Sequence, residues 1–201
     1  MKTQTPAGHQ DLGLLIGAGA DPTALAAYLD GLDDAARVRE VRSLSRQALA
    51  ALYERCATAP PLTLSEWVPA SIPAGKTVIC AGLNNLPTFR IFEKRLVRTA
   101  SGQVFGFNFQ TMSFITGPGY FAVTESGNEL LFDYTKVPSQ SEVPADWPLV
   151  KTNDRGFSTF VYKDMHDFCR RVSRDVLIGH AVRRGKSLPN YFVLARRSEN
   201  S

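Results

Sequence analysis

Six polar residues stand in apolar or aromatic segments of this chain, where their side chains could do chemistry. They are Asn108, Gln110, Tyr120, Tyr134, Tyr162 and His180. An amide, phenol or imidazole on an otherwise apolar wall needs a hydrogen-bond partner, which a ligand, an ordered water or another of the six could supply. We therefore predict that these residues supply the polar groups of one cavity.

The six residues fall into two predicted roles, catalysis and ligand contact. His180 is the candidate general base near neutral pH, and Tyr162 is the candidate acid or oxyanion donor, if the protein is an enzyme. The sequence leaves open whether it is one. His180 also fits a histidine that is satisfied within the core, because its neighbours on the same strand face are apolar. The remaining four are the candidate ligand contacts: Asn108, Gln110, Tyr120 and Tyr134.

The prediction for Asn108 and Gln110 depends on which face of their strand points inward. Neighbouring side chains of a strand point to opposite faces, so Phe105, Phe107 and Phe109 lie opposite the two amides. The phenylalanine face suits packing against helices outside the wall, which would leave the amides inside. The opposite arrangement, with the phenylalanines in a dry and filled core, stays open.

Several chemistries lack their motif in this sequence. The chain has no G-x-S-x-G elbow, and its three histidines are not spaced as a metal pair. The glycine-rich stretch 13–19 follows no strand and does not fit a dinucleotide fingerprint. We therefore expect neither a metal nor a cofactor.

The charge pattern argues against specific nucleic-acid binding. The net charge is only +4, and an RNA-recognition strand needs a basic residue, a glycine and spaced aromatics where this chain has Gln103, Val104 and Gln110. The basic residues gather late in the sequence, as on a solvated face. Such an excess allows, at most, weak contact with a membrane surface.

The elements that must position the six residues are mainly strands. Aromatic-rich segments at 104–110, 120–124 and 129–135 alternate with Gly, Pro, Ser and Asn, which is typical of a curved antiparallel sheet. Further strands are expected at 76–82 and 157–163, and a final hairpin at 176–182 and 191–196. The stretch 85–97 favours a helix, and 164–174 a helical turn or a wide loop.

The first part of the chain is different in pattern. Asp21-Pro22 is a helix start, and apolar residues then recur at helical spacing. We expect Leu25, Leu29, Val41, Leu49 and Leu52 to form a stripe that packs on the sheet. The predicted order is a disordered lead at 1–20, a helical cap at 21–57, a Pro-rich linker at 58–75 and an antiparallel β-barrel domain at 76–197.

Composition sets the class of protein. The 201 residues are 44% hydrophobic and 21% charged, which is ordinary for a globular chain. No apolar run reaches the roughly 18–20 residues that span a bilayer, and we expect no secretory signal at 12–20. The three cysteines are odd in number and widely spaced, so reduced thiols and a cytoplasmic location are expected.

The C-terminal segments FVYKDMHDFCRRV, VLIGHAV and NYFVLAR resemble the end of lipocalin-like barrels, and are most similar to the plastid-lipid-associated (fibrillin) type. In this resemblance Tyr162, Arg171, Gly179 and the run 192–194 match a tyrosine strand, a basic segment, a glycine and a terminal Phe-Val-Leu strand. It covers about 40 residues, and Cys169-Arg170 stands where the family has Leu-Arg. The resemblance implies an apolar ligand inside a barrel.

The fold class expected is therefore α+β and mainly β: an antiparallel curved sheet or lipocalin-like barrel with an N-terminal helical cap. The function expected is binding of a hydrophobic small molecule in the barrel cavity. Two alternatives stay open, because one fold supports many functions. One is an isomerase, cyclase or lyase acting on an apolar substrate, and the other is a structural or regulatory protein with a filled barrel.

Overall fold

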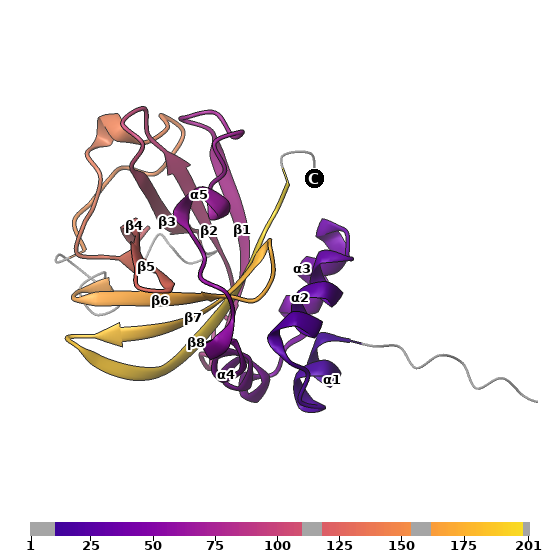
Figure 1. Cartoon of the computed structure of the whole chain (residues 1–201). Helices are drawn as coiled ribbons and strands as arrows, with labels where there is room; N and C mark the ends of the chain where they lie inside the picture. Colours follow the sequence, from indigo (N-terminus) through magenta and orange to yellow (C-terminus); the bar gives the residue numbers. More distant parts are fainter. Residues whose placement is uncertain (1–10, 110–117, 154–161, 199–201) are drawn as a thin grey trace, which may run out of the picture.

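The computed structural model describes residues 11–109, 118–153 and 162–198 of the chain. Within them, eight strands form one closed antiparallel barrel in which each strand pairs with the next and β8 pairs with β1 (Figure 1). The predicted fold class is confirmed. The strands are β1 (Thr77–Asn84), β2 (Ile91–Arg98), β3 (Val104–Phe109), β4 (Tyr120–Ser126), β5 (Glu129–Asp133), β6 (Met165–Arg171), β7 (Val176–Arg183) and β8 (Lys186–Arg196).

The helices come before the barrel in the sequence. Each of the first four begins at a residue whose side chain accepts a hydrogen bond from a backbone N–H of the first turn: Asp11, Asp21, Asp33 and Ser45. The helices are α1 (Leu12–Gly17), α2 (Pro22–Asp30), α3 (Asp34–Ser43), α4 (Arg46–Arg55) and α5 (Leu64–Trp67), with short 3-10 turns η1 (Cys56–Thr58) and η2 (Gln140–Glu142).

Helices α1–α4 lie together on the outside of the barrel, beside β7 and β8 (Figure 1). Their predicted stripe is buried there, because the outer faces of the neighbouring strands are apolar as well. The strand residues in this shared core are Leu83, Val176, Ile178, Val193 and Ala195. The helix residues are Leu25, Leu29, Val41, Leu49 and Leu52.

The phenylalanine face of β3 also points outward, but a loop covers it and the helices do not. Phe107 packs edge-on against Trp147, with ring centroids 4.7 Å apart. Phe105 belongs to the same cluster. The helices cover the part of the wall made by β7, β8 and β1, so the chain uses its Pro-rich segment 137–150 to cover β3 and β4.

Three expectations for local structure were wrong. Residues 12–17 form α1 within the expected disordered lead, because Leu12 and Ile16 are buried against the other helices. Most of 85–97 is β2, and 164–174 contains β6. Both strands pair along their length with neighbours on each side, and this pairing outweighs local helical spacing. The strand expected at 157–163 lies mostly outside the described residues.

One end of the barrel is sealed by α5. Trp67 is fully buried in the same cluster as the inward residues Val78, Leu96 and Leu194, which lie at this end of their strands. Arg196 donates to the backbone carbonyl of Trp67 at 2.9 Å. At the opposite end, where β3 and β5 finish, the described residues line a cavity.

Glycines make room for the aromatic rings inside. A Cβ added to Gly179 would lie 2.1 Å from the ring of Phe192, and one added to Gly82 would lie 2.6 Å from the ring of Phe92. The outer end of each ring therefore lies against the backbone of a neighbouring strand. Only glycine permits this approach, and the rings leave the centre of the barrel unfilled near its open end.

The helical packing leads to a first prediction. Leu49→Ala removes a fully buried side chain from the interface between α4 and the barrel, and it should lower the free energy of unfolding by about 2–5 kcal/mol. Leu14→Ala in α1 is the matched control, because that leucine is 61% exposed; its effect should stay below about 0.5 kcal/mol. Urea unfolding followed by circular dichroism measures both. Equal small effects would mean that the helices are only loosely attached.

The seal at α5 leads to a second prediction. The backbone N–H of Thr63 and then Arg171 lower the pKa of Glu66 to about 2. A depressed carboxyl pKa stabilises the fold above its ordinary value near 4.5, and this contribution disappears as the pH falls toward 2. Glu66→Gln should therefore cost roughly 0.5–1 kcal/mol at neutral pH and much less at about pH 2.

Thermal melts of both forms across this pH range check the second prediction. Glu142→Gln is the comparison, because Glu142 caps the turn η2 in the same way, through Ser139, which also lowers its pKa, but no arginine pairs with it among the described contacts. Its melting temperature should fall less than that of Glu66→Gln at neutral pH. A deficit of Glu66→Gln that persists at pH 2 would count against the role of the charge.

Candidate functional site

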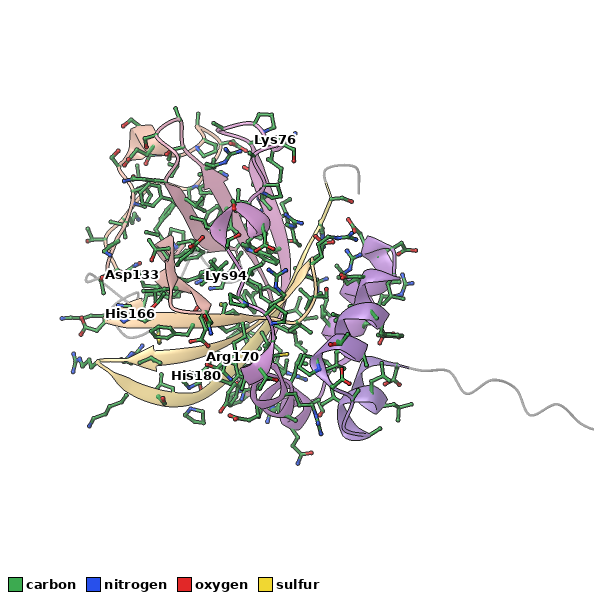
Figure 2. The ribbon with its side chains drawn as sticks, viewed as in Figure 1. Lys76, Lys94, Asp133, His166, Arg170 and His180 are labelled. Carbon is green, nitrogen blue, oxygen red and sulfur yellow. The ribbon has the colours of Figure 1, made fainter. Side chains whose placement is uncertain are left out.

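A buried lysine marks the centre of the barrel. Lys94 is on the inward face of β2 and is only 2% exposed (Figure 2). Its ammonium donates three hydrogen bonds, to Asn108 Oδ1 at 3.0 Å, to Tyr134 Oη at 2.5 Å and to Asp167 Oδ2 at 3.1 Å. A lysine has three N–H donors, so this set uses all of them.

The partners of Lys94 are also bonded to one another. The Tyr134 hydroxyl donates to Asp167 Oδ2 at 3.2 Å and accepts from Asn108 Nδ2 at 2.9 Å. Burial and the nearby Asp167 carboxylate raise the pKa of Tyr134 well above its usual value. The phenol therefore stays protonated at every physiological pH, and its O–H donates to the Asp167 carboxylate. We call Lys94, Asn108, Tyr134 and Asp167 the lysine cluster.

Aromatic rings surround the ammonium. Its Nζ lies 4.7 Å from the centroid of Phe121, 4.9 Å from Phe192 and 5.2 Å from Phe132. The negative faces of aromatic rings attract a cation at such distances. The rings thus offset part of the cost of taking Lys94 out of water, and the ion pair with Asp167 offsets more.

The lysine cluster stands at the inner end of a cavity of about 520 Å³. Among the described residues, its lining includes the β1–β2 connection and the start of β8, at the end opposite α5. Its walls are mostly aromatic and aliphatic. The lining residues outside the cluster include Phe89, Phe92, Tyr162, Met165, Ala181 and Phe192. Arg183 stands nearer the rim, two residues beyond Ala181 on β7.

Three of the six predicted site residues meet in this cavity. Asn108 and Tyr134 belong to the lysine cluster, and the ring of Tyr162 stacks on that of Tyr134 with centroids 5.3 Å apart. The inward orientation of the Asn108 face of β3 is the one the sequence favoured. Gln110 lies outside the described residues.

The other two predicted residues lie on the outer face of the barrel. His180 is packed beneath α4 (Figure 2). It lies between the rings of Tyr53 and Tyr191, whose centroids are 5.2 and 5.4 Å from that of the imidazole. Tyr120 is under the loop that covers β3 and β4, where its hydroxyl donates to the Pro148 carbonyl at 2.5 Å. Burial raises the pKa of Tyr120 to about 12. The structure does not bring either side chain to the cavity.

Lys94 and Asp167 were missed at the level of sequence, although a signal was present. Along β2, Lys94 stands between Phe92 and Leu96 at spacings of two, so it shares their face. Asp167 stands in the same way between Met165 and Cys169 in β6. A charge flanked at both positions by apolar residues predicts a buried charge once the segment is taken as a strand. The expected helix at 85–97 hid this pattern for Lys94.

Comparisons of the chain with protein-family models, with curated proteins and with solved structures found no match. The fold is thus described by its topology alone, as a closed eight-stranded antiparallel barrel with outer helices. The site must be interpreted from its own geometry.

The lysine cluster leads to a third prediction. Lys94→Met leaves Asp167 buried without its counter-charge and should lower the free energy of unfolding by about 3–5 kcal/mol. The double variant Lys94→Met/Asp167→Leu removes both charges and should recover most of that loss. Denaturant unfolding of the single and double variants forms the cycle.

Lys136→Met is the surface control for this cycle. Its side chain is 64% exposed and pairs with Asp133 at 3.2 Å, so its loss should cost below about 1 kcal/mol. If Lys94→Met proves equally mild, the ammonium is not held as the structure indicates.

Proposed function

We propose that the barrel binds an amphipathic small molecule, with its apolar body against the aromatic walls and its polar group on the lysine cluster. One observation carries this proposal: an ion pair whose ammonium is fully hydrogen-bonded stands in a cavity that is otherwise mostly apolar. Small-molecule sites are concave and apolar, with a few polar groups that fix the orientation of the ligand. A volume of about 520 Å³ lies within the range of such sites.

The cavity favours this function over a purely structural barrel. The sealed end is filled by side chains around Trp67, whereas the open end keeps its volume next to the ion pair. The similarity of the C-terminal segments to lipocalin-like barrels of the fibrillin type supports an apolar ligand as well. Phe192 and Gly179, which carry part of that similarity, form a wall of the cavity and the backbone under it.

An enzyme acting on an apolar substrate, as an isomerase, cyclase or lyase, is the second candidate. The Tyr134 phenol favours it, because this neutral acid is bonded to both an ammonium and a carboxylate and could donate a proton to a bound substrate. Tyr162, next to it, keeps its proposed role as acid or oxyanion donor. His180 keeps its proposed role as a base only if a substrate reaches the outer face, because it does not line the cavity.

We also propose a cytoplasmic location. The three cysteines are free thiols and buried, as is usual in a reducing compartment. No helix among the described residues is long and apolar enough to cross a membrane.

A fourth prediction tests binding. Ala181→Phe places a ring in the cavity from the wall formed by β7, and it should weaken binding of the apolar fluorophore N-phenyl-1-naphthylamine by about tenfold or more. Thr124→Phe is the matched control, because Thr124 is exposed on β4; affinity should not change. Fluorescence titration measures affinity, and thermal melts show whether each variant is folded.

The same titration could refute the proposal. If the native chain does not bind the fluorophore, or if both variants bind as tightly as the native chain, the cavity is not a binding site. Native mass spectrometry of the protein purified from its own host would add a direct observation of a retained molecule.

A further inference from the structure

The hydrogen-bond inventory of the lysine cluster determines what kind of head group a ligand can bring. The Lys94 ammonium has no donor left, because Asn108, Tyr134 and Asp167 take all three. The Tyr134 hydroxyl both donates and accepts within the cluster. A ligand that only accepts hydrogen bonds, such as a carboxylate, would have to displace one of these contacts to reach the ammonium.

Two hydrogen-bonding groups of the cluster remain unused and could bind a ligand: one acceptor and one donor. Within the described residues, Asp167 uses only Oδ2, for both Lys94 and Tyr134, and Oδ1 makes no hydrogen bond. Asn108 gives one N–H of its Nδ2 to Tyr134, and the described contacts leave the other unused. Both residues line the cavity. The charged acceptor of Asp167 and the neutral donor of Asn108 are thus close together, because both residues contact the Lys94 ammonium.

The charge of the cluster is already balanced. Lys94 and Asp167 form a buried pair at 3.1 Å, so a charged head group would enter without a counter-charge. A carboxylate would also meet the unbonded oxygen of Asp167, and an ammonium would meet Lys94. An unpaired charge in a buried site is costly, and the cavity therefore selects against both.

We propose that the ligand is an alcohol, whose uncharged hydroxyl donates to Asp167 Oδ1 and accepts from Asn108 Nδ2. A hydroxyl is the smallest group that matches both remaining capacities at once. This inference rests on the proposed binding function and adds the class of ligand to it.

Arg183 is the only other cation among the described residues that line the cavity. It already has an interaction of its own, and it stands nearer the rim than Asp167. The binding of a carboxylate at the rim would depend on Arg183, and substitutions in the lysine cluster would not change its affinity. This arrangement is the one that the experiment must separate from the proposal.

The experiment compares three ligands with the same ten-carbon chain: decan-1-ol, 1-methoxydecane and decanoate. Each displaces bound N-phenyl-1-naphthylamine at neutral pH. The alcohol should compete about tenfold better than the ether, which accepts but cannot donate, and better again than the acid. The ether and alcohol differ by one methyl group, so their ratio isolates the donated hydrogen bond.

Two variants locate this preference. Asp167→Asn should reduce the advantage of the alcohol over the ether to about threefold or less while the fluorophore still binds. Because this variant leaves Lys94 without its counter-charge and risks unfolding, the double variant Lys94→Met/Asp167→Leu serves the same purpose with both charges removed. It should bind alcohol and ether about equally.

The outcomes separate the two proposals. Failure of the fluorophore and of all three ligands to bind would refute the binding function and the inference together. Binding of the fluorophore with equal competition by alcohol and ether would refute the inference alone. So would strongest competition by decanoate, and its loss in Arg183→Gln would then assign an acid head to the rim.

Discussion

The burial of one ammonium group constrains the rest of this structure. Lys94 is almost fully buried, so its three hydrogens need acceptors within the barrel, and β3, β6 and the residue after β5 each supply one. A shift of one residue in the pairing of any of these strands would turn its acceptor to the outer face. Because an unpaired buried charge is costly, the contacts of Lys94 favour one register for β2, β3, β5 and β6.

The barrel is built differently at its two ends. Near α5, Trp67 and the inward aliphatic residues fill the space. Toward the other end, aromatic rings lie against Gly82 and Gly179, and the lysine cluster and the cavity occupy the centre.

The outer wall explains why two promising polar residues have no place in the cavity. The barrel is covered outside by helices on one part and by the Trp147 loop on another, so the strands under these covers are apolar on both faces. A polar residue in such a strand is buried whichever way it points. His180 packs among aromatic rings, and the Tyr120 hydroxyl donates to a backbone carbonyl.

The sequence by itself determined the type of each element that has a clear period. Alternation and turn residues predicted the antiparallel sheet, the final hairpin and the inward face of Asn108, and the spacing of Leu49 and Leu52 predicted a helical face on the barrel. These patterns are local, and they suffice to assign a helix or a strand because the two have different side-chain periods. The same patterns could not show which strand face is inside when both faces are apolar, as at His180.

Only the tertiary structure decided that Lys94 and Asp167 form a pair. They are 73 residues apart, and their contact depends on the closure of the barrel, which brings β2 and β6 to face each other across its interior. The segment 85–97 has apolar spacing that fits a helix as well as a strand, and pairing with β1 and β3 resolved it. The sequence therefore indicated only part of the candidate site. Its neutral residues, Asn108 and Tyr134, were predicted from strand alternation, whereas the pairing of Lys94 with Asp167 depends on the closure of the barrel.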